Sequence, residues 1–354
     1  MIATTPQTVL EFLTRNWAIV ASVCTIALAL LIVLLVLGRY SRIFFNILRS
    51  TKPPLSRSPL DYEPFEAEVV DFAAYDGLRL SGMLVPAAAG TPWRGTIIFA
   101  HEYTSDMRSA ARYCRPLQRV GYDIFAFDFR GHGRSDAEPG YTPRQWLTER
   151  ELYDFRGAIA YVQRQLRKRG RPERIGAFGI SRGACAAIVA AAETDAIRAI
   201  VADGAYSTDR VAEYFMKRWA EIFGSNPMLH ENYPEWIWRF LRWIMLSRAR
   251  RRLGCTFPSV CKAVMRMAPR PILFIHGEKD SYLPVEQSRL LYALAGQPKY
   301  LWIAEGARHN QAVVLHAERY ALATVRFFDR HLAGRPAAPP VHRPAEQADH
   351  AEPC

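Results

Sequence analysis

A serine, an aspartate and a histidine, residue types that act together in nucleophilic catalysis, each follow a separate apolar run of the chain. Ser181 lies within Gly179-Ile-Ser-Arg-Gly183, and the alanine-rich segment 184–192 comes directly after it. Glycines two residues before and after the serine allow a sharp turn that exposes its oxygen at the start of a helix. The backbone N–H of the next residue then faces the place where an oxyanion would develop.

The carboxylate and the imidazole come later in the chain. Asp280 ends Ile272-Leu-Phe-Ile-His-Gly-Glu-Lys-Asp280, and His309 ends Tyr300-Leu-Trp-Ile-Ala-Glu-Gly-Ala-Arg-His309. A single polar residue after a strand is usually an ordinary loop residue. Three in the order serine, acid, histidine, each just past an apolar run, indicate a nucleophile, its base and an orienting acid.

These residues need a scaffold that brings distant segments together, and the hydropathy pattern predicts one. Strand-like runs alternate with helix-like stretches. The expected strands are 67–73, 78–85, 95–101, 122–127, 174–179, 197–202, 271–276 and 299–304, and the expected helices include 146–167, 183–193, 285–295 and 311–331. This alternation predicts an α/β fold: a mostly parallel sheet with helices on both faces and an antiparallel hairpin at one edge, turning at Tyr75-Asp76-Gly77. Its chemistry belongs at the carboxyl ends of the strands.

Several segments match the motifs of one superfamily. They are Phe99-Ala-His-Glu-Tyr103, Phe127-Asp-Phe-Arg-Gly-His-Gly-Arg-Ser135, Gly179-Ile-Ser-Arg-Gly183, His276-Gly-Glu-Lys-Asp280 and Gly306-Ala-Arg-His309. On these motifs the chain resembles the α/β-hydrolase superfamily over roughly residues 65–332. The resemblance implies a serine hydrolase that needs no cofactor and no metal.

The resemblance also implies a role for each matched residue. Ser181 would be the nucleophile, His309 the general base and then the general acid, and Asp280 the group that orients and stabilises the imidazolium. The backbone N–H groups of Tyr103 and Arg182 would form the oxyanion hole.

One position departs from the family pattern, because His101-Glu102 stands where His-Gly is usual after the third strand. A carboxylate beside the oxyanion donors opposes the developing negative charge unless a cation neutralises it. One hypothesis is therefore a Glu102–Arg182 pair at the floor of the pocket, and the alternative is that both side chains point to water. Arg130-Gly-His-Gly133 matches a structural loop of the family, so no chemistry is assigned to His132.

The start of the chain predicts a membrane anchor. Residues 17–37 carry no charge and are rich in Ile, Leu, Val and Ala, and about 20 such residues cross the hydrocarbon core. A cleaved signal peptide is the alternative, but its apolar region is about 7 to 15 residues long and ends at small residues. Basic residues at 39, 42, 49, 52 and 57 follow the span, which places the catalytic domain in the cytoplasm.

The expected organisation follows from these assignments. It consists of an N-terminal segment 1–16, a transmembrane helix 17–37, a basic juxtamembrane linker 38–64, an α/β-hydrolase domain 65–332 with a cap insertion at about 205–268, and a tail 333–354. The tail is rich in Pro and Ala and poor in large apolar residues, so we expect it to be disordered.

The cap insertion interrupts the alternation of strands and helices and is rich in aromatic residues. Trp236, Phe240 and Trp243 share one helical face, and the basic run 248–252 follows. An apolar cap suggests an apolar substrate. Either the aromatic face packs on the domain, or it touches a membrane with the arginines on anionic headgroups.

Composition excludes other classes of protein. The six cysteines of the 354 residues form no C-x-x-C pair and no Cys/His cluster with metal-ligand spacing, so neither a disulfide framework nor a zinc site is expected. The formal charge of +12 alone would fit nucleic acid, but no nucleic-acid-binding motif is present. The expected partners are a lipid bilayer and a small apolar acyl substrate.

These observations together predict a membrane-anchored serine hydrolase that cleaves acyl esters, or thioesters or amides, through an acyl-Ser181 intermediate. An acyltransferase using the same triad and a non-catalytic binding module are the alternatives. Because the histidine must be neutral to accept a proton, the rate should climb with pH over about pH 6 to 7.

Overall fold

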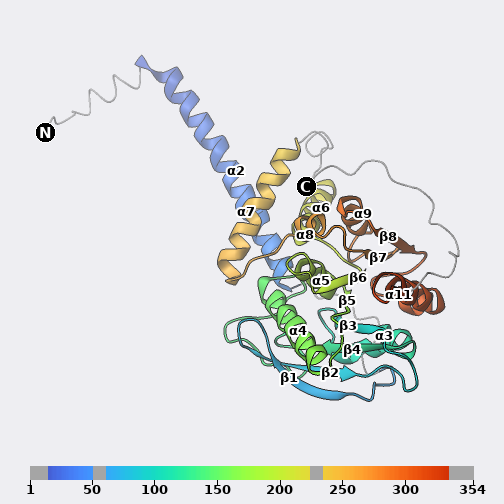
Figure 1. Ribbon diagram of the computed structural model, residues 1–354. Helices are drawn as coiled ribbons and strands as arrows, with labels where there is room; N and C mark the ends of the chain where they lie inside the picture. Colours follow the sequence, from blue (N-terminus) through green and yellow to red (C-terminus); the bar gives the residue numbers. More distant parts are fainter. Residues whose placement is uncertain (1–14, 51–60, 224–233, 335–354) are drawn as a thin grey trace.

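A single sheet of eight strands forms the centre of the protein (Figure 1), which we describe from a computed structural model of residues 15–50, 61–223 and 234–334. The strands are β1 (Glu68–Ala73), β2 (Arg79–Val85), β3 (Gly95–Ala100), β4 (Tyr122–Phe127), β5 (Ile175–Ile180), β6 (Ile197–Asp203), β7 (Ile272–Gly277) and β8 (Lys299–Ala304). Their order is β1-β2-β4-β3-β5-β6-β7-β8. The β1–β2 and β2–β4 pairs are antiparallel and the other pairs are parallel. The predicted sheet and its edge hairpin are confirmed, because every strand end lies within one residue of its expected place.

Helices cover both faces of this sheet, as predicted. One face packs on α3 (Ala110–Arg119), α10 (Ala312–Leu315) and α11 (Ala317–His331). The other packs on α4 (Glu149–Lys168), α5 (Arg182–Ala191), α8 (Val260–Arg266) and α9 (Glu286–Leu294). The inner strands β3, β4, β5 and β7 are buried along their whole length. This double coverage explains why these strands are mostly apolar and lack a regular polar alternation.

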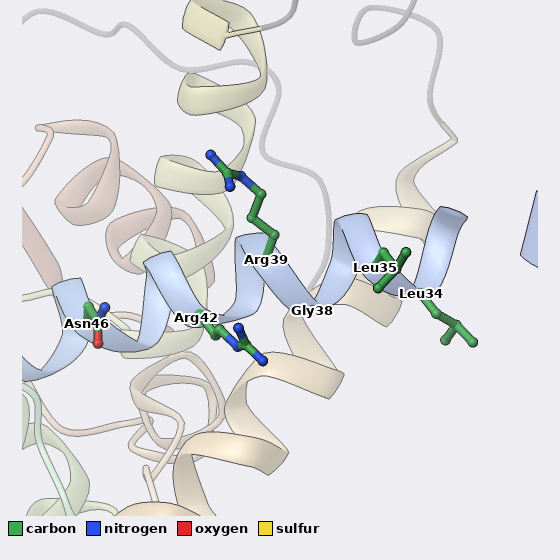
Figure 2. Close-up of a pocket in the computed structure, with 6 residues that line it drawn as sticks. All are labelled: Leu34, Leu35, Gly38, Arg39, Arg42 and Asn46. Atoms are coloured by element: carbon green, nitrogen blue, oxygen red, sulfur yellow. The ribbon is translucent and has the colours of Figure 1, made fainter. Parts of the chain in front are cut away.

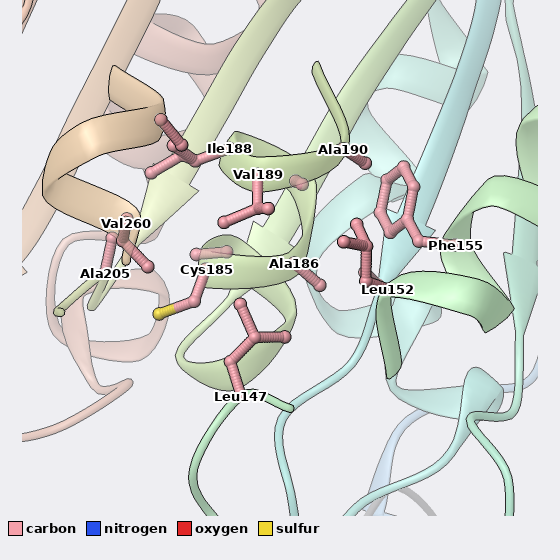
Figure 3. Close-up of a cluster of buried hydrophobic side chains, with 14 of the residues drawn as sticks. Leu147, Leu152, Phe155, Cys185, Ala186, Ile188, Val189, Ala190, Ala205 and Val260 are labelled. Atoms are coloured by element: carbon pink, nitrogen blue, oxygen red, sulfur yellow. The ribbon is translucent and has the colours of Figure 1, made fainter. Parts of the chain in front are cut away.

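Helix α5 lies in the middle of the larger apolar cluster, and all of its residues are buried. Figure 3 shows it between Leu152 and Phe155 of α4 and Val260 of α8. Its alanines occupy little space, so neighbouring elements approach closely around the residues that follow Ser181. Cys185 belongs to this packing: its thiol donates to the carbonyl of Tyr206 at 3.0 Å, and burial raises its pKa to about 12.

Two helices differ from the sequence prediction. The expected helix 311–331 is divided at His316, whose φ of −128° and ψ of 47° are not helical. Helix α4 begins three residues later than the expected 146, because Thr148 caps it and forms a capping box with Glu151.

The insertion after β6 contains α6 (Thr208–Phe223) and α7 (Glu235–Leu253). In α7 the predicted aromatic face does not pack on the domain: Trp236, Phe240 and Trp243 are 64%, 49% and 63% exposed. Trp238, on another side of the helix, is buried instead. The interpretation of the aromatic stripe as core is therefore wrong.

The predicted span 17–37 and the residues after it form the long helix α2 (Trp17–Ser50). Most of its described large apolar side chains are exposed, but Val20 and Phe45 are partly buried. In the part of the chain that the structure describes, no helix has both the length and the apolarity needed to cross a membrane. Side chains 33, 36 and 37 of the predicted span 17–37 lie outside the described residues. No described helix therefore supports the transmembrane assignment.

Parts of the predicted organisation fall outside the described residues. They are residues 1–14 of the N-terminal segment, 51–60 of the linker, 224–233 of the insertion and 335–354 of the tail.

Candidate active site

Ser181 occupies the turn between β5 and α5 in a strained conformation, with φ 53° and ψ −116°. Its own N–H donates to the carbonyl of Asp203 at 2.7 Å, which ties the turn to β6. The backbone passes so close to both flanking positions that only glycine fits. A Cβ on Gly179 would lie 2.4 Å from the backbone oxygen of Gly183, and a Cβ on Gly183 would lie 2.1 Å from the backbone oxygen of Ala100. The sequence motif thus marks a turn whose strain falls on the serine itself.

The structure brings the three predicted residues together at the carboxyl ends of β5, β7 and β8. The Nε2 atom of His309 lies 3.1 Å from Oγ of Ser181, and its Nδ1 lies 2.6 Å from Oδ2 of Asp280. All three residues are buried. A proton can therefore pass from the serine hydroxyl to the imidazole, while the carboxylate holds the ring through Nδ1–H.

Asp280 is surrounded by donors that keep it ionised. Its Oδ1 accepts the backbone N–H groups of Tyr282 at 2.9 Å and Leu283 at 2.8 Å. Burial alone raises the pKa of Asp280, but His309 and His276 outweigh burial through charge and hydrogen bonds and hold this pKa well below its usual range. An ionised carboxylate is what an orienting acid must be.

Arg182 does not pair with Glu102, and that hypothesis is wrong. The fully buried guanidinium points from the first residue of α5 toward α4, where Nη1 lies 3.4 Å from a carboxylate oxygen of Glu151. It packs against the rings of Tyr103 and Phe129, at 5.1 and 5.0 Å from their centroids. The N–H of Arg182 belongs to the first turn of α5, which leaves it without an intrahelical acceptor and suited to bind an anion.

Glu102 is also buried, so the alternative in which both side chains point to water is wrong as well. Electrostatically it interacts with Arg112, His309 and Asp203, and its Oε2 has no hydrogen-bond partner. Burial raises the pKa of Glu102, which favours the neutral acid. The conflict between this residue and an oxyanion is therefore reduced by burial rather than by Arg182.

Two histidines fix the loop that carries Tyr103. His101 is buried, and its Nε2 accepts the N–H of Phe129 at 3.1 Å while Nδ1–H donates to the carbonyl of Glu102 at 2.7 Å. The Nε2 of His132 lies 2.6 Å from the carbonyl oxygen of Tyr103. His132 thus positions the loop that carries Tyr103, the predicted oxyanion donor, whereas its Arg-Gly-His-Gly motif had predicted only a structural loop.

Within the described ranges, no cluster of three or more His, Cys, Asp or Glu side chains is arranged to hold a metal ion.

The chain is similar to several known proteins. The family model for serine aminopeptidase, S33, matches residues 91–252. The chain is 28% identical to protein YfhR of Escherichia coli O157:H7 over 270 residues, covering 75% of this chain and 81% of YfhR. It is 25% identical to the acyltransferase drtE of Aspergillus calidoustus over 290 residues, covering 70% of this chain and 89% of drtE. The solved esterase Pf2001 of Pyrococcus furiosus superposes with a TM-score of 0.54 at 25% identity, covering 79% of this chain and all of the esterase.

The chain has the α/β-hydrolase fold. The family match and the esterase neighbour together indicate a hydrolase.

In this α/β-hydrolase, a second histidine contacts the acid from the strand that precedes it. The Nε2 of His276 donates to the carbonyl of Leu283 at 2.9 Å and lies 3.3 Å from Oδ2 of Asp280. Its Nδ1 contacts Oγ of Ser288 at 2.7 Å. Burial lowers the pKa of His276. Asp280 raises this pKa by a larger amount through a hydrogen bond and charge, so the net shift is upward. The matched motif His276-Gly-Glu-Lys-Asp280 begins at this histidine, but it predicted a role only for its aspartate.

We expect His276→Leu to lower kcat/KM for a soluble ester by about threefold to tenfold. The substitution removes the ring whose Nε2 lies 3.3 Å from Oδ2 of Asp280, so the carboxylate that holds His309 loses one of its neighbours. Activity assays and urea unfolding of the same proteins measure the two effects separately. His276→Gln keeps an N–H donor and should lose less activity, whereas equal kcat/KM for all three proteins with only a loss of stability would reduce His276 to a packing role.

Proposed function

We propose that the protein is a serine hydrolase that cleaves carboxylic acyl esters through an acyl-Ser181 intermediate. The observation that carries this proposal is the unbroken hydrogen-bonded series from Oγ of Ser181 to His309 at 3.1 Å and on to Asp280 at 2.6 Å. The esterase Pf2001 has the same fold.

In the proposed reaction, Oγ of Ser181 attacks the acyl carbon while Nε2 of His309 accepts the hydroxyl proton. The N–H groups of Arg182 and Tyr103 bind the oxyanion that forms. His309 then gives its proton to the leaving alkoxide, and an alcohol departs. Water, deprotonated by His309, attacks the acyl-enzyme and releases a carboxylic acid and the free serine.

Aromatic rings beside the triad support an apolar acyl group as the substrate. The ring of Tyr282 packs edge-on against His309 at 5.1 Å, and the ring of Tyr103 lies over the guanidinium of Arg182. We expect a series of soluble esters of graded acyl length to be hydrolysed, with kcat/KM rising as methylenes are added, by about threefold to fourfold for each one buried. A preference for acetyl over all longer groups would contradict the apolar site.

Transfer of the acyl group to an alcohol or amine is the second candidate, and the similarity to the acyltransferase drtE favours it. The acyl-enzyme is the same, and only the acceptor differs from water. Analysis of products with added alcohols and amines separates the two reactions, because a transferase forms the new ester or amide in preference to the free acid. The serine aminopeptidase match raises amides as further substrates of the same site.

We also propose that the enzyme works at a lipid bilayer with its catalytic domain on the cytoplasmic side. The exposed apolar side chains of α2, among them Leu34 and Leu35, and the basic residues that follow support this proposal. Fractionation of cells followed by protease protection tests both parts, because a protein found only in the soluble fraction would contradict the first.

A further inference from the structure

The cap helix α7 contacts α2 and crosses it (Figure 1). Together the two helices carry many exposed apolar side chains. Toward their C-terminal ends the two helices meet where the guanidinium of Arg252 lies 5.3 Å from the centroid of the Phe45 ring. Farther out on α7, Trp236, Phe240 and Trp243 are exposed, and the rings of Phe240 and Trp243 stack at 6.1 Å. These three large aromatic side chains are exposed to water on one helix face. Such exposure costs free energy unless a partner covers the side chains.

The contact between Arg252 and Phe45 allows positions on the two helices to be compared. At 1.5 Å per residue, Trp243 is about 13 Å from Arg252 along α7, and Leu35 is about 15 Å from Phe45 along α2. Trp243 of α7 and Leu35 of α2 therefore lie at about the same distance from the meeting point, each measured along its own helix.

Cationic side chains form a second band nearer the hydrolase domain. On α7 these are the exposed Arg250, Arg251 and Arg252 of its last turn. On α2 they are Arg39 and Arg42, which also line a groove together with Leu34 and Leu35 (Figure 2). On α2 an outer apolar stretch is thus followed by an inner cationic one, and on α7 three exposed aromatic residues, with the exposed Arg239 among them, lie outside the cluster of Arg250, Arg251 and Arg252.

This order matches the layers of a bilayer surface, where acyl chains lie beneath anionic phosphates. Aromatic rings favour the interface between the two layers, and arginine forms bidentate contacts with phosphate. A protein partner would also cover apolar side chains, but the paired bands on two separate helices specifically fit a layered, negatively charged surface.

We propose that α2 and α7 form one binding surface for anionic phospholipid, with the face of Trp236, Phe240 and Trp243 in the interfacial layer and Arg250, Arg251 and Arg252 on the phosphates. This surface rests on the proposal that the enzyme works at a lipid bilayer, and it says which residues contact the lipid. It does not depend on the chemistry of Ser181. It makes the cap, and not α2 alone, part of the membrane contact, so the cap sits against the lipid from which an acyl ester would come.

The test is flotation of the full-length protein with two kinds of vesicle, phosphatidylcholine alone and phosphatidylcholine mixed with phosphatidylglycerol. Replacing the three aromatic residues with serine should weaken partitioning into both by about tenfold or more. Replacing Arg250, Arg251 and Arg252 with glutamine should remove mainly the preference for phosphatidylglycerol. Leu315→Ser with Leu322→Ser, at exposed apolar positions of α10 and α11, is the matched control and should bind as the native protein does.

A second measurement detects α7 even where α2 dominates the total affinity. Brominated lipids should quench the fluorescence of native protein more than that of a Trp236→Phe/Trp243→Phe variant, which keeps aromatic rings but loses two reporters. Equal fractional quenching of the two proteins, or serine and glutamine variants that bind like the control, would overturn the proposal. Lipid-free self-association that disappears in the serine variant would instead assign the face to a second copy.

Hydrolysis of a soluble short-chain ester without vesicles separates this proposal from the proposed function. All of these variants should keep native activity, since none alters the triad. Native protein that floats with vesicles but cleaves no ester would refute the hydrolase and leave the lipid surface standing.

Discussion

Ser181→Ala is expected to lower kcat/KM for ester hydrolysis by about a thousandfold to a millionfold. Oγ of Ser181 is the atom that lies 3.1 Å from Nε2 of His309, and alanine leaves no nucleophile there. The residual rate should come from binding and from the oxyanion donors alone. Assays with a soluble ester measure the loss of turnover. Mass spectrometry after treatment with a serine-directed phosphonate should show that labelling at position 181 is lost together with turnover.

The fold should survive this substitution. Alanine meets the same backbone strain at φ 53° as serine does, so the unfolding free energy should change by no more than about 1 kcal/mol. Ser259→Ala, which removes the hydroxyl that caps α8, is a control that should keep its activity and its labelling. If Ser181→Ala is folded and retains a tenth or more of native activity, the serine mechanism is excluded. Labelling without any turnover in the native protein would favour a binding module.

Arg182→Met is expected to destabilise the protein by about 3 to 5 kcal/mol. Arg182 and Glu151 are both fully buried, so removal of the guanidinium leaves a carboxylate in a low-dielectric interior with its cation gone. Thr148 and Tyr141 still donate to Glu151, but they carry no charge. Urea unfolding measures the loss. Arg182→Lys keeps the charge but loses the planar stacking on Tyr103, so its free energy of unfolding should lie between those of the native protein and Arg182→Met.

Double-mutant cycles distinguish the observed pairing from the one first hypothesised. Arg182→Gln and Glu151→Gln should be strongly non-additive in stability, because each removes the partner of the other. Arg182→Gln and Glu102→Gln should be additive, because Arg182 contacts Glu151, whereas Glu102 interacts electrostatically with Arg112, His309 and Asp203. Coupling above about 1 kcal/mol between positions 102 and 182 would contradict the separation of the two side chains.

Local hydropathy and chain order were enough to predict the sheet. An apolar run bounded by turn residues forms a strand largely irrespective of its neighbours, and β3, β4, β5 and β7 are buried on both faces. Because parallel strands end at one edge, the order of Ser181, Asp280 and His309 already predicted that they meet. Their distances of 3.1 and 2.6 Å agree with that prediction.

The direction of a side chain, in contrast, was decided only by the tertiary structure. Arg182 and Glu102 were predicted to pair, yet the guanidinium of Arg182 contacts Glu151 of α4, and the buried carboxylate of Glu102 interacts electrostatically with Arg112, His309 and Asp203. The stripe of Trp236, Phe240 and Trp243 has the same spacing whether it faces a core or solvent, and only the placement of α7 exposed it. Sequence thus determined which residues reach the edge of the sheet, whereas long-range packing determined what each of them touches, since contacts between distant segments leave no periodic signal in the chain.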